Sequence, residues 1–149
     1  MAKRRIEHSP VTNLKALCEA YDYGKPSAFS RAMKVKCGNV VTIYVSGTAS
    51  IDEKGVSLHI GDLKAQMDRM YQNVTMLLET EGADWHDVVR TTYYLRDIDR
   101  DYDPFNVYRC DFYEKVGLPF PPASTGVEAR LCRPELLIEM EAIAMYIED

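Results

Sequence analysis

The sequence predicts a single α+β domain whose strands and helices follow the order ββαβαββ. Three observations indicate this fold class. Residues 136–144 alternate apolar and polar side chains, which is the period of a β-strand. Two longer segments, 62–82 and 103–117, repeat their apolar residues with the spacing of a helix. The chain has 149 residues, a length that suits one domain with one hydrophobic core.

The N-terminal part of the chain predicts a short helix over residues 12–20, which ends at the turn-forming segment 21–26. We interpret this helix as an arm that packs against the rest of the molecule. The chain is therefore divided into an N-terminal extension, residues 1–26, and one domain, residues 27–149.

The first two strands of that domain are predicted at residues 29–36 and 39–46, as an antiparallel pair with a turn at Cys37 and Gly38. Residues 40–45 are apolar on both faces of their strand, so we expect this strand to be buried on both sides. Residues 46–49 are then expected to leave the sheet.

Each predicted helix is bounded by residues that commonly begin and end helices. Asp62 can accept hydrogen bonds from the free amides of the first turn of one helix, and Gly82 ends it. Asp103 is expected to cap the second helix, with Pro104 in its first turn and Gly117 at its end.

Three further strands are predicted at residues 88–95, 121–130 and 136–144. In the last of them, Glu139 and Glu141 lie on one face. The other face is apolar and consists of Ile138, Met140, Ala142 and Ala144. Two carboxylates on one face of an apolar strand cost free energy unless a partner pairs with them or a function needs them. This pair is the first indication of a site.

The number of helices has a consequence for assembly. Two helices can cover only one face of a sheet of this size, yet the predicted strands carry apolar residues on both faces. The uncovered face must meet another surface, and a second copy of the chain is the simplest candidate.

Composition excludes several classes of function. The formal net charge is −5, and an acidic surface repels nucleic-acid phosphates, so we expect no nucleic-acid partner. No apolar run approaches the ~18 residues of a membrane helix, and no secretory signal follows the basic N-terminus, so we expect no membrane partner. The four cysteines and three histidines show no metal-binding spacing. We expect reduced thiols, a cytoplasmic location, and neither a metal nor a cofactor.

Three motifs near the C-terminus resemble one known family: Phe-Pro-x-x-Ser at 120–124, Val-Glu-Ala-Arg-Leu at 127–131 and Ile-Glu-Met-Glu-Ala-Ile-Ala at 138–144. They resemble the YjgF/RidA (Rid) superfamily of small trimeric imine deaminases, and the similarity extends over roughly residues 27–147. The resemblance implies a chorismate-mutase-like topology, a homotrimer, and ligand clefts between neighbouring subunits. It also implies hydrolase or deaminase activity on a small carboxylated metabolite.

The resemblance also implies which residues form the site. Glu139 matches the family glutamate that positions or activates the attacking water, although it could instead form a salt bridge across a subunit interface. The ligand-binding positions that the resemblance implies are Phe29, Ser46, Gly47, Thr48, Asn106, Ala123, Ser124 and Thr125. Arg31 is added to them because it follows Phe29 by two residues and so shares its face of the predicted strand. Phe29 stands where the family has a tyrosine in the cleft. Ser46 and Gly47 could equally form a turn at the end of a strand. Asn106 could instead be a helix residue whose side chain bonds to the local backbone.

One of these positions departs from the family pattern. Deaminases of the family have an arginine directly before Ser124, which holds the substrate carboxylate, and this chain has Ala123. Ordinary imine deaminase activity is therefore expected to be weak. Arg31 could replace the missing arginine as a carboxylate anchor, or it could be a solvated charge at the edge of the sheet.

Four functions remain open from the sequence. The first is an enzyme or binder of the Rid type that acts on a carboxylated imine, enamine or related planar acid. The second is a hydrolase of an enolpyruvyl ether, because residues 46–51, the motif His59-x-Gly61-Asp62 and Gln66 resemble the C-terminal half of chorismatases. The third is a non-catalytic trimer that binds a small acid. The fourth is an endoribonuclease, which the acidic charge disfavours.

Overall fold

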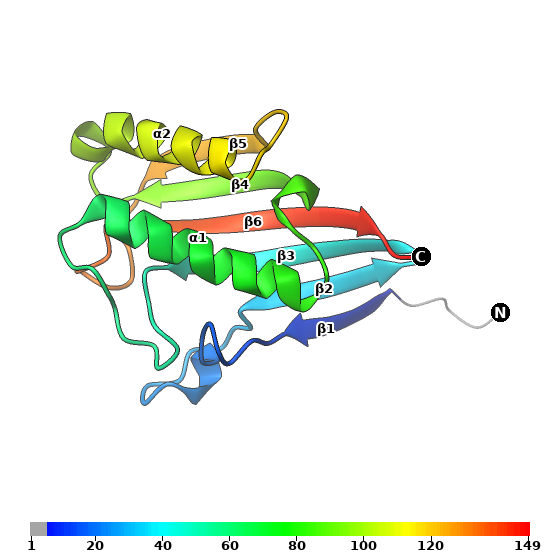
Figure 1. Ribbon diagram of the computed structural model, residues 1–149. Helices are drawn as coiled ribbons and strands as arrows, with labels where there is room; N and C mark the ends of the chain where they lie inside the picture. The colour runs from blue at the N-terminus through cyan, green and yellow to red at the C-terminus, as the bar shows by residue number, and fades with distance from the viewer. Residues whose placement is uncertain (1–5) are drawn as a thin grey trace.

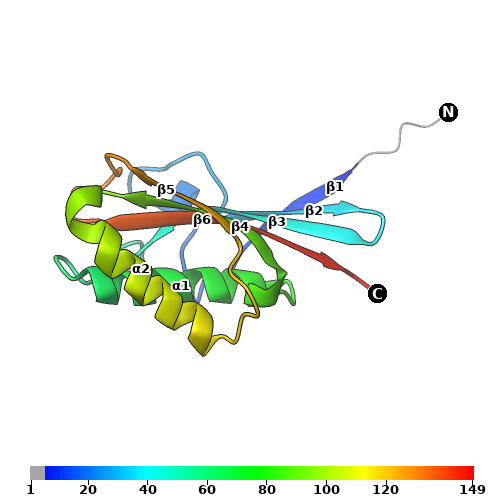
Figure 2. The same ribbon diagram turned by 90° about the horizontal axis from the view of Figure 1, so that it is seen from above.

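The computed structural model describes residues 6–149 as one six-stranded sheet with two α-helices on one of its faces (Figures 1 and 2). The elements are β1 (Glu7–Val11), β2 (Ala32–Cys37), β3 (Val40–Ala49), α1 (Leu63–Thr80), β4 (Val88–Leu95), α2 (Ile98–Lys115), β5 (Ala123–Glu128) and β6 (Ile138–Ile147). Short 3₁₀ helices span Ala20–Asp22 and Trp85–Asp87. The α+β fold class is therefore confirmed.

The strands lie in the order β1-β2-β3-β6-β4-β5. Neighbouring strands are antiparallel, except that β4 and β5 are parallel. The last long strand, β6, therefore lies in the middle of the sheet between β3 and β4, which places its residues at the centre of both faces (Figure 1).

The first helix begins and ends as predicted. The side chain of Asp62 accepts a hydrogen bond from the amide of Ala65 at 3.0 Å. Gly82 follows the helix with a φ of 72°, a left-handed conformation that glycine adopts at little cost.

The second helix begins six residues earlier than the sequence suggested. Asp97, not Asp103, is its N-cap and accepts a hydrogen bond from the amide of Arg100. Asp103 and Pro104 lie inside α2. The helix is capped by an earlier aspartate, although proline is most common in the first turn of a helix. The end was predicted correctly, because Gly117 follows with a φ of 74°.

The N-terminal region differs most from the prediction. The helix expected at residues 12–20 is wrong: β1 pairs with β2, and the segment after it forms turns and one short 3₁₀ helix. Val11, Ala16, Leu17 and Ala20 are fully buried, so the described part of this region does pack against the rest of the molecule, although not as a helix. β2 begins at Ala32, three residues later than predicted, and β3 continues through residues 46–49, which were expected to leave the sheet.

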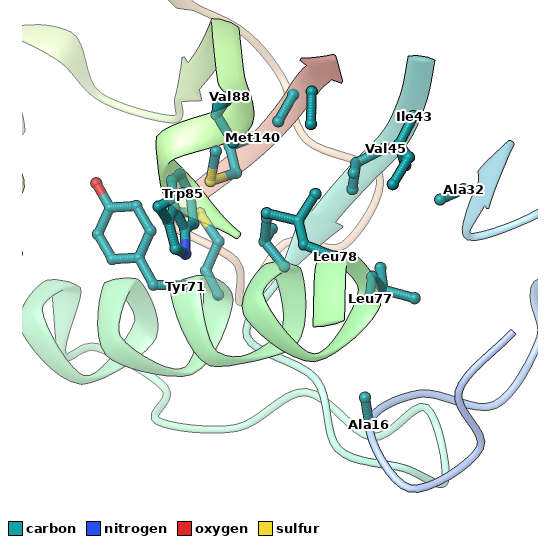
Figure 3. Packing of buried hydrophobic residues seen from close by; sticks show 14 of the residues in the cluster. Ala16, Ala32, Ile43, Val45, Tyr71, Leu77, Leu78, Trp85, Val88 and Met140 are labelled. Atoms are coloured by element: carbon teal, nitrogen blue, oxygen red, sulfur yellow. The ribbon is translucent and has the colours of Figure 1, made fainter. Parts of the chain in front are cut away.

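The core lies between the sheet and the two helices. Tyr71, Leu77 and Leu78 of α1 face Val45 of β3 and Met140 of β6, and all five are buried (Figure 3). Apolar side chains of one face of β6 meet the helices, as the alternating pattern predicted. Among the described residues, no helix is long and apolar enough to cross a membrane.

The opposite face of the sheet carries no α-helix in the part of the chain that the structure describes (Figure 2). Strand β3, expected to be buried on both sides, is buried on one side only: Tyr44 is 49% exposed on the open face. Met145 and Ile147 of β6 are 45% and 67% exposed on the same face. A face with these exposed apolar side chains is a candidate contact surface for another chain.

Candidate functional site

A cavity of about 920 Å³ lies at one end of the open face of the sheet. Its walls come from the end of β3, from β6, from the segment 22–31 and from the turn before β6. Five of the residues expected from the sequence line it: Phe29, Arg31, Ser46, Gly47 and Glu139. The structure thus brings together one part of the expected site.

Glu139 is one of the acidic residues that line this cavity. It lies on β6 between Ala49 of β3 and Tyr94 of β4, and its side chain is half-buried on the open face. Burial raises the pKa of the Glu139 carboxyl above its usual range, the charge of Arg133 opposes this rise, and Glu141 adds to it. No salt bridge pairs Glu139 among residues 6–149, so it is a carboxyl with a raised pKa beside a cavity.

The carboxyl of Glu139 packs against Gly47 at an irregularity in β3. The pairing of β3 with β6 shifts between Val45 and Thr48, which leaves Ser46 and Gly47 as an irregular pair of residues. A β-carbon on Gly47 would overlap Oε1 of Glu139 and would stand 3.1 Å from its Cδ. Glycine at this position is what allows the carboxyl to lie against the backbone.

Hydrogen bonds fix the irregular residues of β3. The amide of Ser46 donates to the carbonyl of Arg31 at 3.0 Å, and its hydroxyl donates to the carbonyl of Ser30 at 2.6 Å. The hydroxyl of Thr48 donates to the carbonyl of Ser46 at 2.8 Å, and Thr48 is buried. Ser46 and Gly47 therefore face the cavity, whereas Thr48 supports the backbone behind them.

Two guanidinium groups also line the cavity. Arg31 is 3% exposed, donates from Nε to the carbonyl of Cys18 at 2.8 Å, and donates from Nη2 to the hydroxyl of Tyr23. Arg133 donates to the carbonyl of Gly55 at 2.6 Å. Both lie over the ring of Tyr23, at 5.2 and 5.4 Å from its centroid. Arg31 is thus not a solvated edge charge: it lines the cavity, with part of its hydrogen-bonding capacity already used.

The remaining expected residues lie elsewhere on the chain. Ala123, Ser124 and Thr125 form the exposed start of β5, and Asn106 lies on α2. Ser124 accepts a hydrogen bond from Nη1 of Arg109 at 3.2 Å. None of these four expected residues lines the cavity of Glu139. One chain therefore carries two separate parts of the expected site.

Asn106 and Thr125 each have a local partner. Nδ2 of Asn106 donates to the carbonyl of Tyr102 at 3.1 Å, the local bonding that a helix asparagine commonly makes. Thr125 accepts a hydrogen bond from Nη2 of Arg90 at 2.7 Å.

Sequence reasoning missed Arg90 and Tyr23, and it considered Arg133 only as a possible salt-bridge partner of Glu139 from a neighbouring chain. A signal existed for Arg90, because Arg90, Thr92 and Tyr94 alternate with the buried residues of β4 and so share the open face with Glu139. No local pattern indicated Arg133 or Tyr23, because both lie in turns whose approach to the sheet depends on the tertiary fold.

Comparison with known proteins gives consistent matches. The family model described as Endoribonuclease L-PSP matches residues 25–146. A RutC family protein of Pyrococcus abyssi is 36% identical over 116 residues, which cover 78% of this chain and 84% of that protein. The 3-aminoacrylate deaminase RutC of Acinetobacter baylyi is 30% identical over 109 residues, which cover 73% of this chain and 81% of that protein. The solved structure of the Escherichia coli YjgF gene product matches with a TM-score of 0.72 at 26% identity, covering 91% of this chain and 97% of that one.

Proposed function

Because this chain belongs to the YjgF/RidA superfamily, we propose that it forms a homotrimer and hydrolyses a small carboxylated imine or enamine in a cleft between neighbouring copies. The observation that carries the proposal is Glu139, a half-buried carboxyl with a raised pKa that faces a cavity also lined by two arginines. The name of the similar 3-aminoacrylate deaminase describes an enamine that bears a carboxylate, which agrees with this class of substrate.

The chemistry requires one group that can give and take a proton. In imine hydrolysis, the oxygen of water bonds to the imine carbon while the C=N π pair moves to nitrogen, which receives a proton. The amine nitrogen then receives a second proton, the new hydroxyl group gives up its proton as the C=O bond forms, and the C–N bond breaks, so that a carbonyl compound and ammonia leave. Protonated Glu139 donates the proton to nitrogen, and the resulting carboxylate takes a proton from the attacking water. A carboxyl whose pKa is raised toward neutral pH is suited to both steps.

The open face of the sheet supports the trimer. Exposed apolar residues on β3 and β6 give a second copy a surface to bury, and the expected site is divided into two parts that lie apart on one chain. A neighbouring chain would bring the start of β5, with Ala123 to Thr125, to the cavity of Glu139.

Ala123 limits the substrate. A bidentate pair between an arginine and a carboxylate is charge-assisted, and one such bond contributes roughly 1.5–3 kcal/mol. Without that arginine, simple 2-imino acids should react about ten- to a hundredfold more slowly than with arginine-bearing relatives.

The other candidate functions receive less support. The chorismatase-like residues have structural roles here: Asp62 caps α1, and Gln66 is fully buried, with its side chain bonded to the backbone of His59, Glu135 and Leu137. For an endoribonuclease, the formal net charge of −5 disfavours the approach of nucleic-acid phosphates to the chain.

The proposal is tested with an imine of known structure. An L-amino-acid oxidase converts leucine to its 2-imino acid, and semicarbazide traps the imine that remains. Addition of the purified chain should shorten the lifetime of the imine, and Glu139→Gln should abolish this effect. If the chain binds 4-methyl-2-oxopentanoate, the keto-acid product, but does not accelerate decay, it is a non-catalytic binder. If it does neither, the proposed substrate class is wrong.

A further inference from the structure

We infer that Arg90 is the residue that binds the carboxylate of the ligand, an inference that rests on the proposed function. Arg90 lies on β4 directly opposite Ala123 of β5. Side chains of paired residues project from the same face of a sheet, with the strands about 4.8 Å apart. The small side chain of Ala123 therefore leaves space beside an exposed guanidinium on the open face.

The charge of Arg90 is available. Its one side-chain hydrogen bond runs from Nη2 to the hydroxyl of Thr125, and no carboxylate forms a salt bridge with it in the described part of the chain. The cations Lys34, Lys64 and Arg100 each have a carboxylate partner at 3.2 Å or less. A guanidinium has five N–H donors, so most of those of Arg90 are free to bind a planar anion.

The other arginines near the site have fewer N–H groups free to bind an anion. Arg31 and Arg133 already donate to backbone carbonyls. Arg109 donates to Ser124 and Asn106 and lies over the rings of Phe105 and Tyr93, on the side of the sheet that the helices cover. Among these four guanidinium groups, Arg90 combines exposure on the open face with a single neutral partner.

A second cavity places Arg90 at a binding surface. This cavity, of about 590 Å³, is lined by Arg90, Tyr44 and Thr92, and it shares Ser46 and Glu141 with the cavity of Glu139. Its volume is within the range of small-molecule sites. The ring of Tyr44 lines the same cavity as Arg90 and offers an apolar surface for the planar part of a ligand.

The register of the sheet determines which copy contributes Arg90. Glu139 pairs with Tyr94 on β4, four residues from Arg90, and that separation is roughly 13 Å along a strand. In addition, the bond to Thr125 directs the guanidinium toward β5, away from Glu139. A small ligand that contacts both residues must therefore take Glu139 from one chain of the proposed trimer and Arg90 from another.

The first test compares two imines that differ only in the carboxylate. Leucine with an amino-acid oxidase gives the carboxylated imine, and 3-methylbutylamine with an amine oxidase gives the neutral one. Arg90→Ala should lower the rate on the carboxylated imine about ten- to a hundredfold relative to the neutral imine. Arg90→Lys should recover part of the loss, because it keeps the charge but not the paired donors. An equal effect of Arg90→Ala on both imines would overturn the inference.

A rescue variant and a control complete the set. In the Arg90→Ala background, Ala123→Arg returns a guanidinium to the adjacent position of the same face, so it should restore selectivity for the carboxylated imine. Lys64→Ala removes one positive charge from an exposed pair on α1 and should leave both rates unchanged. Failure of the rescue in a correctly folded double variant would contradict the assigned position.

Binding separates this inference from the proposed reaction. Wild type should bind 4-methyl-2-oxopentanoate in calorimetry, and Arg90→Ala should bind it at least tenfold more weakly. If this difference in binding is found but wild type shows no turnover, the carboxylate-binding role of Arg90 is supported and the proposed imine hydrolysis is contradicted. Turnover by wild type with equal binding by both proteins would support hydrolysis and overturn the role of Arg90.

Mixed oligomers test the contribution of two copies. Arg90→Ala and Glu139→Gln, refolded together, should recover part of the wild-type activity, because some clefts then combine an intact Arg90 with an intact Glu139. If oligomers shown by mass to contain both variants stay inactive, the two residues do not come from different chains.

Discussion

The carboxyl of Glu139 lies against the backbone of Gly47, at the irregularity where β3 and β6 change register. Gly47 does not have a positive φ, so the absence of a side chain there serves the close approach of the carboxyl and not a turn. The position of the proposed acid therefore depends on a residue from another strand.

Gly47→Ala should displace Glu139 without unfolding the protein. The added methyl group overlaps Oε1, and the carboxyl must move away from it. Misplacement of a catalytic group by about 1 Å can cost roughly a hundredfold in rate. We expect a loss of that size in imine hydrolysis, with a melting temperature close to that of wild type.

Gly126→Ala is the matched control for this change. Gly126 also lies in a strand without a positive φ, and nothing stands within 4 Å of an added β-carbon. Activity and stability should both be unchanged. A similar loss of activity in the two variants would show that Glu139 is not specifically held by Gly47.

The pKa of Glu139 gives the protein a pH dependence of stability. Burial raises the pKa of Glu139 in the folded state above its pKa in the unfolded state. At pH values between these two pKa values, the folded state therefore binds more protons than the unfolded state. This contribution is fully present below the ordinary value of about 4.5 and is lost as the pH rises through the folded-state pKa. We therefore expect Glu139→Gln to gain stability relative to wild type as the pH rises from 4 toward neutral, measured by thermal unfolding. A difference that does not change with pH would contradict the raised pKa.

The open face of the sheet should be the contact between copies. Sedimentation of wild type should give about three times the 17.0 kDa mass of one chain. Met145→Glu places a charge among exposed apolar residues of β6 and should dissociate the oligomer. Ile60→Glu changes an exposed loop residue and should not. A monomeric wild type at micromolar concentration would disprove the trimer.

Local patterns predicted much of the fold. The capping Asp62, the glycines at 82 and 117, and the alternation through Glu139 and Glu141 each depend on short-range geometry that a sequence displays. The start of α2 was missed because Asp97 and Asp103 are both plausible caps, and only packing decides between them. The strand β1 was missed because its burial pattern shows four exposed residues of five, so it has no apolar alternation to recognise.

The candidate site was predicted less completely. Glu139 and Gly47, which the resemblance implied, line one cavity together with Arg31, which strand geometry suggested. Arg133 comes from a turn, and Arg90 from a strand two places away from β3, so their approach depends on the order of the sheet, which no local pattern encodes. The separation of Ser124 and Thr125 from Glu139 is likewise a property of the tertiary structure.

The proposed role of Glu139 as acid and base is tested most directly by Glu139→Gln, measured for turnover and for thermal unfolding of the assembled protein. The substitution keeps the shape of the side chain and removes the proton-transfer group. If Glu139 is catalytic, the variant should assemble and melt at or above the wild-type temperature at neutral pH, while imine hydrolysis falls at least about a hundredfold. If Glu139 is instead half of a buried ion pair between chains, the variant should melt earlier or lose its oligomeric state. Reduced stability with turnover intact would contradict the account.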